Sequence, residues 1–158
     1  MSITTDIVES WRRPRAVVRR HLARGQSEPF AFSLLVAFLV LAFVAQWPNA
    51  SRAAFEGGNT PVAPRLLAIG LALLATIPLW YGLAGLSRLV ARAFGGRGSW
   101  YGARIALFWS LVAVTPVMLL QGLVAGMIGP GPGLTAVGVI AALAFVVFWA
   151  LALLEVER

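Results

Sequence analysis

The sequence predicts an all-α integral membrane protein, with four transmembrane helices in a bundle and an N-terminal cytoplasmic amphipathic segment. Of its 158 residues, 59% are hydrophobic and only 12% are charged, and the mean hydropathy is +0.84. A soluble domain of this length carries about 25% charged residues. So few charges do not cover the surface of a soluble globule. The surplus apolar surface is therefore expected to face lipid.

Four apolar runs without a charged residue are long enough to cross a bilayer. They contain 18, 22, 23 and 21 residues, at positions 30–47, 66–87, 105–127 and 134–154. At 1.5 Å per residue the longer runs reach roughly 32–35 Å, against a hydrocarbon core of about 30 Å. We therefore expect a single four-helix membrane domain over residues 29–158, preceded by a basic arm over residues 1–28.

The arginines set the expected orientation. All 13 cationic residues are arginine, which favours a bacterial source with a GC-rich genome. With the arm in the cytoplasm, eleven arginines, including Arg158 in the tail, fall on the cytoplasmic side, and only Arg52 and Arg65 fall outside. Because cytoplasmic loops are enriched in basic residues, we expect a multi-pass protein of a bacterial inner membrane with both termini cytoplasmic. The net charge of +7 is assigned to this orientation, so no nucleic-acid partner is expected.

The arm combines six arginines with apolar residues at helical spacing. Ile3, Ile7 and Trp11 share one face of a helix. Two interpretations stay open, because such a segment can lie on the cytoplasmic leaflet and bind anionic lipid head groups, or its charges can serve only to fix orientation. The candidates for contact with the membrane surface or with a partner are Trp11, Arg12, Arg13, Arg15, Arg19, Arg20 and Arg24.

A proline interrupts the third apolar run. Pro116 leaves the carbonyl of Val112 without its helical donor, which costs about 3 kcal/mol or more in a soluble helix. Inside a helix bundle, a neighbouring helix or a Ser/Thr hydroxyl can meet the freed carbonyl. Ser110 and Thr115 are close enough in sequence to do so.

Other residues predict further kinks and close helix packing. Pro78, with Thr76 beside it, is expected to act in the second span as Pro116 does in the third. The two kinks can form a hinge or a cavity, or they can be static bends that improve packing. Gly122 and Gly126 form a GxxxG pair, which lets two helices approach closely, either within the chain or between two copies.

The sequence contains no evident catalytic centre. No ionisable residue lies inside the four runs, which argues against a proton-coupled transporter or a membrane protease. The absence of cysteine excludes disulfides and thiol catalysis, and the glycine-rich segment 95–102 lacks the Gly-Lys-Ser/Thr ending of a phosphate loop. His21 is expected to be a surface residue rather than a ligand. We therefore expect no enzymatic activity, no cofactor and no metal.

Two segments carry a resemblance to a known family. The segments RRPRAVVRRHLARG (12–25) and GGRGSWYGARIALFWSLVAVTPVML (95–119), with the Gly/Pro turn that follows, resemble the bacterial branch of the Yip family, the Ypt-interacting membrane proteins. The matching positions are Gly95, Gly96, Gly98, Tyr101, Trp109 and Pro116. The chain has four predicted spans where members usually have five, and it lacks the acidic N-terminal motif of the eukaryotic relatives that act with small GTPases. The resemblance implies a non-enzymatic polytopic membrane protein, such as a scaffold or accessory subunit.

Two functions remain open at this stage. The first is a non-catalytic interaction protein that packs against a larger membrane complex or against itself, through the Gly122/Gly126 face and the basic cytoplasmic surface. The second is a small-solute transporter or channel subunit, with a pore between the two kinked helices. The expected pore-lining residues are Thr76, Ser110, Thr115 and Gln121.

Overall fold

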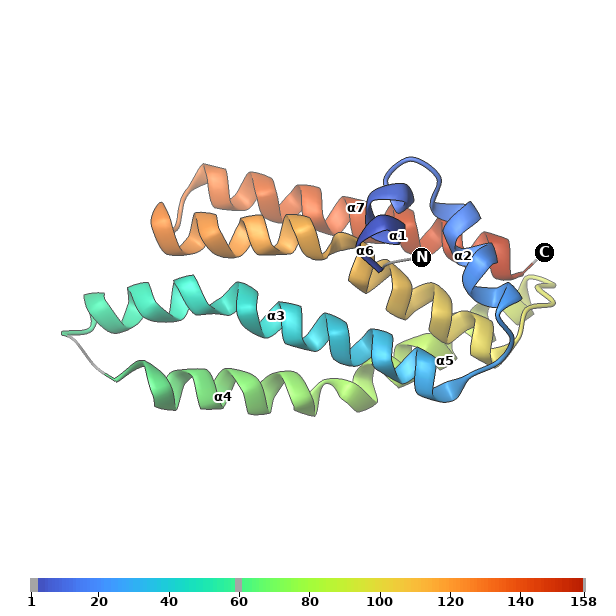
Figure 1. The fold of residues 1–158 in the computed structure, drawn as a ribbon, viewed down its shortest axis with the longest axis horizontal. Coiled ribbons are helices and arrows are strands. Elements are labelled where there is room, and N and C mark those ends of the chain that lie inside the picture. The colour runs from blue at the N-terminus through green and yellow to red at the C-terminus, as the bar shows by residue number, and fades with distance from the viewer. Residues whose placement is uncertain (1–2, 59–60, 158) are drawn as a thin grey trace.

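The computed structural model describes residues 3–58 and 61–157, which form seven α-helices and no strand (Figure 1). Two short helices, α1 (Ile3–Ser10) and α2 (Pro14–Ala23), make up the arm. The spans are α3 (Glu28–Glu56), α4 (Val62–Ala75) followed by α5 (Ile77–Ala93), α6 (Trp100–Met127) and α7 (Pro132–Val156). Within the described residues, four helical segments are long and apolar enough to cross a membrane, and they pack together. The predicted fold class is confirmed.

The spans are arranged as a row. From bottom to top in Figure 1 the order is α4, α3, α6 and α7, and each of these helices packs on the next. The connections α3–α4 and α6–α7 lie at one end of the molecule, which we call the turn end. The arm, the loop between α5 and α6, and the end of α7 lie toward the other, which we call the arm end. Arg158 lies outside the described residues.

The central contact of the row is between α3 and α6, and glycine permits it. Gly122 faces the backbone of Ala45, and Gly126 faces Pro48. A Cβ atom built on either glycine would overlap those α3 atoms. Close backbone approach of this kind is how small residues strengthen helix pairs in lipid. Within this chain, the GxxxG surface is therefore covered by α3.

The second span is divided into two helices at Thr76. Its hydroxyl donates to the carbonyl of Leu73 at 2.6 Å and accepts the indole N–H of Trp80 at 3.0 Å. Pro78 lies in the first turn of α5, where its missing N–H would have had no helical partner. The sequence predicts a kink like that at Pro116, and the structure shows a helix end and a new helix start instead.

The half of this span toward the turn end stands apart from the rest. None of the residues of α4 is buried, and α4 packs mainly on α3. An apolar groove of about 440 Å³ separates the two helices and is lined by side chains such as Phe43 and Leu71. Water would make such exposure costly, whereas lipid tails are as apolar as the groove itself. This arrangement suits a lipid environment.

Local signals set the ends of the third and fourth spans. Ser99 accepts the backbone N–H of Gly102 at 2.9 Å and caps the start of α6, as its position predicts. Gly129 adopts a φ of 90° just after α6 and donates its N–H to the carbonyl of Val124. Glycine takes this left-handed conformation at little cost, so the chain can turn sharply into α7.

We expect Gly122→Ala to destabilise the chain, because the added methyl group overlaps the carbonyl of Ala45. Overpacking of this kind costs about 1–3 kcal/mol. Thermal unfolding in mild detergent should show a clear fall in Tm. The matched control is Gly82→Ala on α5, where nothing lies within 4 Å of the new methyl group. Equal Tm values for the two variants would contradict the close contact between α3 and α6.

Candidate functional site

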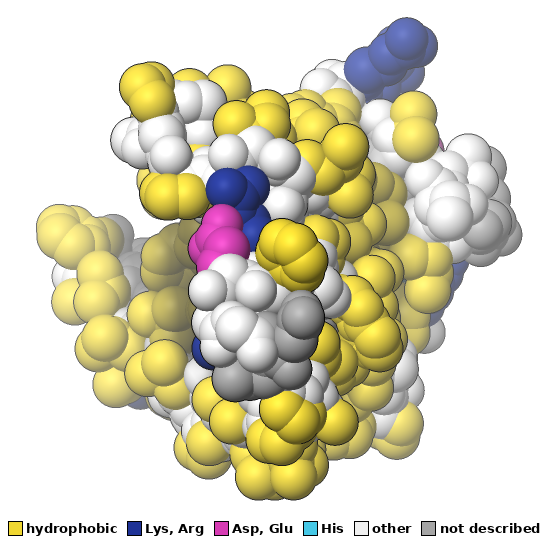
Figure 2. All heavy atoms as spheres, turned by 90° about the vertical axis from the view of Figure 1, so that its left-hand side faces the viewer, with side chains coloured by type: hydrophobic (Ala, Val, Ile, Leu, Met, Phe, Trp, Pro, Cys, Tyr) yellow, Lys and Arg dark blue, Asp and Glu magenta, His cyan; other side chains and the backbone are white. Residues whose placement is uncertain are grey.

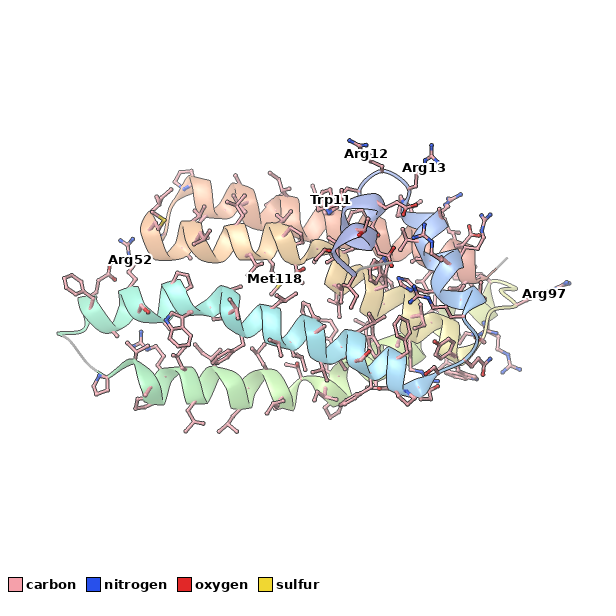
Figure 3. All side chains as sticks on the ribbon, viewed as in Figure 1. Trp11, Arg12, Arg13, Arg52, Arg97 and Met118 are labelled. Carbon is pink, nitrogen blue, oxygen red and sulfur yellow. The ribbon has the colours of Figure 1, made fainter. Side chains whose placement is uncertain are left out.

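The most elaborate polar contacts of the chain lie where the arm meets α6. In Figure 3 the arm lies alongside the part of α6 that precedes its bend, with Trp11 directed toward the bundle. Its helices contact α6 and α7, and Val17 and Val18 on α2 belong to the main hydrophobic core. We call this region, with the residues described below, the arm–kink site.

Two side chains donate hydrogen bonds to the backbone of α6 beside Pro116. The hydroxyl of Thr115 donates to the carbonyl of Val112 at 2.7 Å, so one of the two predicted hydroxyls meets the carbonyl that the proline frees. The indole Nε1 of Trp11 donates to the next carbonyl, that of Ala113, at 3.2 Å. Proline disturbs this turn of the helix, and both added bonds fall on it. The bend is therefore tied directly to the arm.

A second indole bond joins the arm to α6 one turn earlier. The Nε1 of Trp109 donates to the hydroxyl of Ser10 at 3.0 Å, and that hydroxyl donates to the carbonyl of Asp6 at 2.8 Å. All three side chains are buried. A buried indole N–H or hydroxyl without a partner is costly, so these bonds select one docked position of α1.

Behind Ser10 lies an ionic cluster within the arm. Arg20 donates to Asp6 at 2.7 Å and to Glu9 at 2.8 Å, and these bonds, with Glu9 the larger contributor, raise the pKa of Arg20. The Asp6 side chain is only 2% exposed, so this arginine compensates a buried carboxylate. The cluster fixes α1 against α2.

His21 is buried in this cluster, contrary to the sequence expectation of a surface residue. Its ring lies between those of Phe30 and Trp109, and its Nε2 is 3.9 Å from a carboxylate oxygen of Asp6. Burial lowers the pKa of His21 from 6.5 to about 4, although Asp6 opposes the shift. The imidazole is therefore neutral near pH 7. The arm therefore packs against protein, and His21 places an aromatic ring on the inner face of α2.

The glycine-rich loop before α6 holds the end of the chain. The backbone N–H of Gly98 donates to Glu157 at 2.8 Å, and Arg88 donates to the same oxygen at 3.2 Å. A Cβ atom on Gly96 or Gly98 would overlap the Glu157 carboxylate, and one on Gly102 would overlap Val156. These glycines therefore allow the end of α7 to approach the loop and the start of α6 closely.

Every acidic side chain of the sequence is engaged in an ion pair with an arginine. The sequence has 6 such residues, all described: Asp6, Glu9, Glu28, Glu56, Glu155 and Glu157. Among the described arginines, those outside ion pairs are Arg12, Arg13, Arg15, Arg24, Arg65, Arg92 and Arg97. Arg65 belongs to the turn end, and the other six lie at the arm end. The uncompensated positive charge is concentrated there.

The seven arm residues singled out from the sequence fall into distinct environments. Trp11 contacts α6, Arg20 binds the acidic pair of α1, and Arg19 binds Glu155 of α7. Arg24 lies over the ring of Phe30. The remaining three, Arg12, Arg13 and Arg15, make no ion pair, and Figure 3 shows Arg12 and Arg13 pointing away from the bundle. In the described part of the chain, no group of three His, Cys, Asp or Glu is placed to hold a metal ion.

A family model for the Yip1 domain matches residues 8–157. The chain belongs to the Yip1 domain family. No curated protein and no solved structure matches the chain with statistical significance. The Yip1 match begins inside α1, so it covers most of the arm as well as the spans. The arm is thus part of the Yip1 domain.

The residues that carry the family resemblance have structural tasks in this Yip1 domain. Gly96 and Gly98 receive the end of α7, while Trp109 and Pro116 belong to the arm–kink site. The docking of α1 was missed from the sequence, because an apolar helix face suits lipid as well as protein. The available signal was Ser10, a polar residue directly before Trp11 and one turn after Asp6 on the same side of α1.

We expect Trp11→Phe to loosen the arm without unfolding the Yip1 domain, because the variant keeps an aromatic ring but loses the five-membered ring of the indole with its N–H donor to Ala113. One hydrogen bond contributes about 1 kcal/mol, so amide exchange of α1 should become about fivefold faster. Exchange measured by mass spectrometry in detergent micelles tests this. Val8→Ala is the control, since Val8 is exposed on the same helix. Unchanged α1 exchange in Trp11→Phe would contradict the indole contact.

We also expect arm docking to weaken as the pH falls from about 6.5 toward 4. An undocked arm binds a proton on His21 more readily than a docked one, so the docked state loses stability across this range and keeps it above pH 6.5. Asp6, Arg20 and Arg24 surround the ring electrostatically. Comparing the pH dependence of α1 protection in the unmodified chain and in His21→Phe isolates the contribution of the histidine, because all other titratable groups are the same in both proteins. An identical pH dependence in both would refute the prediction.

Proposed function

We propose that this Yip1-domain membrane protein is a non-catalytic scaffold or accessory subunit that binds a membrane-embedded partner through exposed amide side chains near its turn end. The membrane location itself follows from the family and the four apolar helices. We further propose a bacterial inner membrane, with the arm end in the cytoplasm. The distribution of arginines between the two ends supports that orientation.

The observation that carries the proposal is a polar hollow of about 130 Å³ between α3 and α6. Its lining includes the amides of Gln46, Asn49 and Gln121, beside Ala45 and Gly122. Gln46 and Asn49 are exposed, and none of the three side chains forms a hydrogen bond with another described residue. We call this the amide hollow.

Several serine and threonine side chains of the spans, by contrast, form hydrogen bonds within their own helices. The hydroxyls of Ser110 and Thr115 donate to carbonyls of α6, and those of Ser33 and Ser87 donate to carbonyls of their own helices. An amide that faces apolar surroundings gains about 0.6–2 kcal/mol from an interhelical hydrogen bond. The amide hollow is therefore a place where a partner helix with polar or small side chains would gain stability.

The surroundings of the hollow agree with this reading. Figure 2 views the turn end and shows a mostly hydrophobic face with basic and acidic groups side by side. Arg52 and Glu56 form an ion pair at 2.8 Å at this end, which lowers the charge that a partner must desolvate. Gln46 lies about 9 Å along α3 from Arg52, so its amide is within the apolar zone.

The pore hypothesis receives less support from the geometry. Ser110 and Thr115 are buried and bonded within α6, and Thr76 is bonded to Leu73 within the second span. Of the four residues expected to line a pore, only Gln121 opens onto the amide hollow.

A photo-crosslinker attached to a single cysteine tests the proposed partner face, because the chain has no cysteine of its own. In native membranes, Gln46→Cys should yield discrete protein adducts, either with another protein or with a second copy. Val44→Cys is the matched control: it is exposed on the same helix, two residues away, and faces a different direction. We expect it to yield lipid adducts only.

Equal protein adducts at the two positions, or none at either, would overturn the proposed interface. Water-soluble thiol reagents address the other hypothesis in the same cysteine background. Strong labelling of Ser110→Cys and Thr115→Cys would favour a transporter or channel subunit, whereas unreactive cysteines agree with the scaffold proposal.

A further inference from the structure

A second hollow, of about 360 Å³, lies at the arm end between the start of α2 and the side of α7. It is lined by Arg13, Pro14, Arg15, Ala16, Arg19 and Leu151. We call it the arginine hollow. It is separate from the amide hollow, which lies toward the other end of the molecule, and it shares no residue with it.

The charges around the arginine hollow are not balanced within the chain. Arg13 and Arg15 make no ion pair with any described acidic residue, since all six acidic side chains are bound elsewhere. Arg19 pairs with Glu155 at 2.8 Å, yet its side chain remains 69% exposed, whereas that of Glu155 is 8% exposed. Three arginines therefore line the hollow, and only one of them is paired with a carboxylate. An anion is the ligand that this charge favours.

The apolar part of the hollow continues along α7. Leu151 shares a helix face with Val147 one turn before it and Leu154 one turn after it, and both of these are more than half exposed. Little of α7 is buried in the chain. A ligand that fits both parts has an anionic head and an apolar tail.

The level of the hollow along α7 agrees with such a ligand. Leu151 lies four residues before Glu155, the first charged residue of this helix. That separation is about 6 Å, so the hollow lies where the apolar zone of α7 ends. Phosphate head groups lie at this boundary, and the planar guanidinium group binds phosphate oxygens with two parallel hydrogen bonds.

We propose that the arginine hollow binds the phosphate group of an anionic phospholipid, with an acyl chain along Leu151 and Val147. The three arginines supply the charge and the donors, and α7 supplies the apolar surface. The proposed partner binding at the amide hollow is not required for this site. Loss of one site would leave the other intact.

The test is lipid binding by the full chain in detergent micelles, followed by quenching of a fluorescent phosphatidylglycerol and by native mass spectrometry. We expect phosphatidylglycerol to bind more tightly than phosphatidylcholine. The double variant Arg13→Gln/Arg15→Gln should bind phosphatidylglycerol about thirtyfold more weakly, because the two arginines near an anionic lipid contribute about 1 kcal/mol each. Phosphatidylcholine binding should not change.

The control is Arg92→Gln/Arg97→Gln, which removes the same charge from two exposed arginines at the arm end, one in the last turn of α5 and one in the loop before α6. It should retain phosphatidylglycerol binding within about twofold of the unmodified chain. An equal loss in both double variants would show a general charge effect and overturn the site. Amide exchange of α1 at an unchanged rate in both variants would confirm that the arm remains docked.

A soluble phosphate compound is the other source of this head-group chemistry. Glycerol phosphate at millimolar concentration should fail to displace the fluorescent lipid, because it lacks the apolar tail that α7 contacts. Complete displacement would overturn the lipid assignment. The absence of any preference for phosphatidylglycerol in the unmodified chain would overturn the site altogether.

Discussion

Backbone carbonyls in an apolar environment need donors, and Pro116 removes one in the middle of the helix on which the rest of the protein packs. The Thr115 hydroxyl meets the carbonyl of Val112, and the Trp11 indole meets that of Ala113. The second of these donors comes from a separate segment, about a hundred residues away in sequence. The hydrogen bond to the backbone of α6 thus fixes the position of the arm, and the docked arm buries its own Asp6 and His21 side chains.

The ion pairs separate the arginines of the molecule into those with and those without an acidic partner. Because each carboxylate of the chain is bound to an arginine, the positive charge that remains belongs to arginines without an acidic partner, and most of those described lie at the arm end. The paired arginines join segments: Arg19 joins the arm to α7, Arg104 joins α6 to Glu28, and Arg88 holds the end of α7. One residue type therefore serves both the packing of segments and the charge of the surface, and Arg19 takes part in both.

The sequence predicted those features that follow from local composition. Apolar run length predicted the four spans, and the position of Thr115 before Pro116 predicted a hydroxyl at the freed carbonyl. Features that depend on which distant segments meet were not predictable in this way. The apolar face of the arm fits a lipid surface and a helix bundle equally well, so burial of His21 could not be foreseen. The glycines before α6 gave no sign that Glu157 would be their neighbour.

Thr76 gives one membrane crossing two sets of neighbours. The portion before it, α4, is attached to α3, while the portion after it, α5, packs mainly on α6 and places Trp80 against Phe38 and Tyr81 against Phe108. Loosening the contacts of α4 would therefore leave those between α5 and α6 in place. A single span of this protein thus has one half built into the hydrophobic core and one half whose main environment is the surrounding lipid.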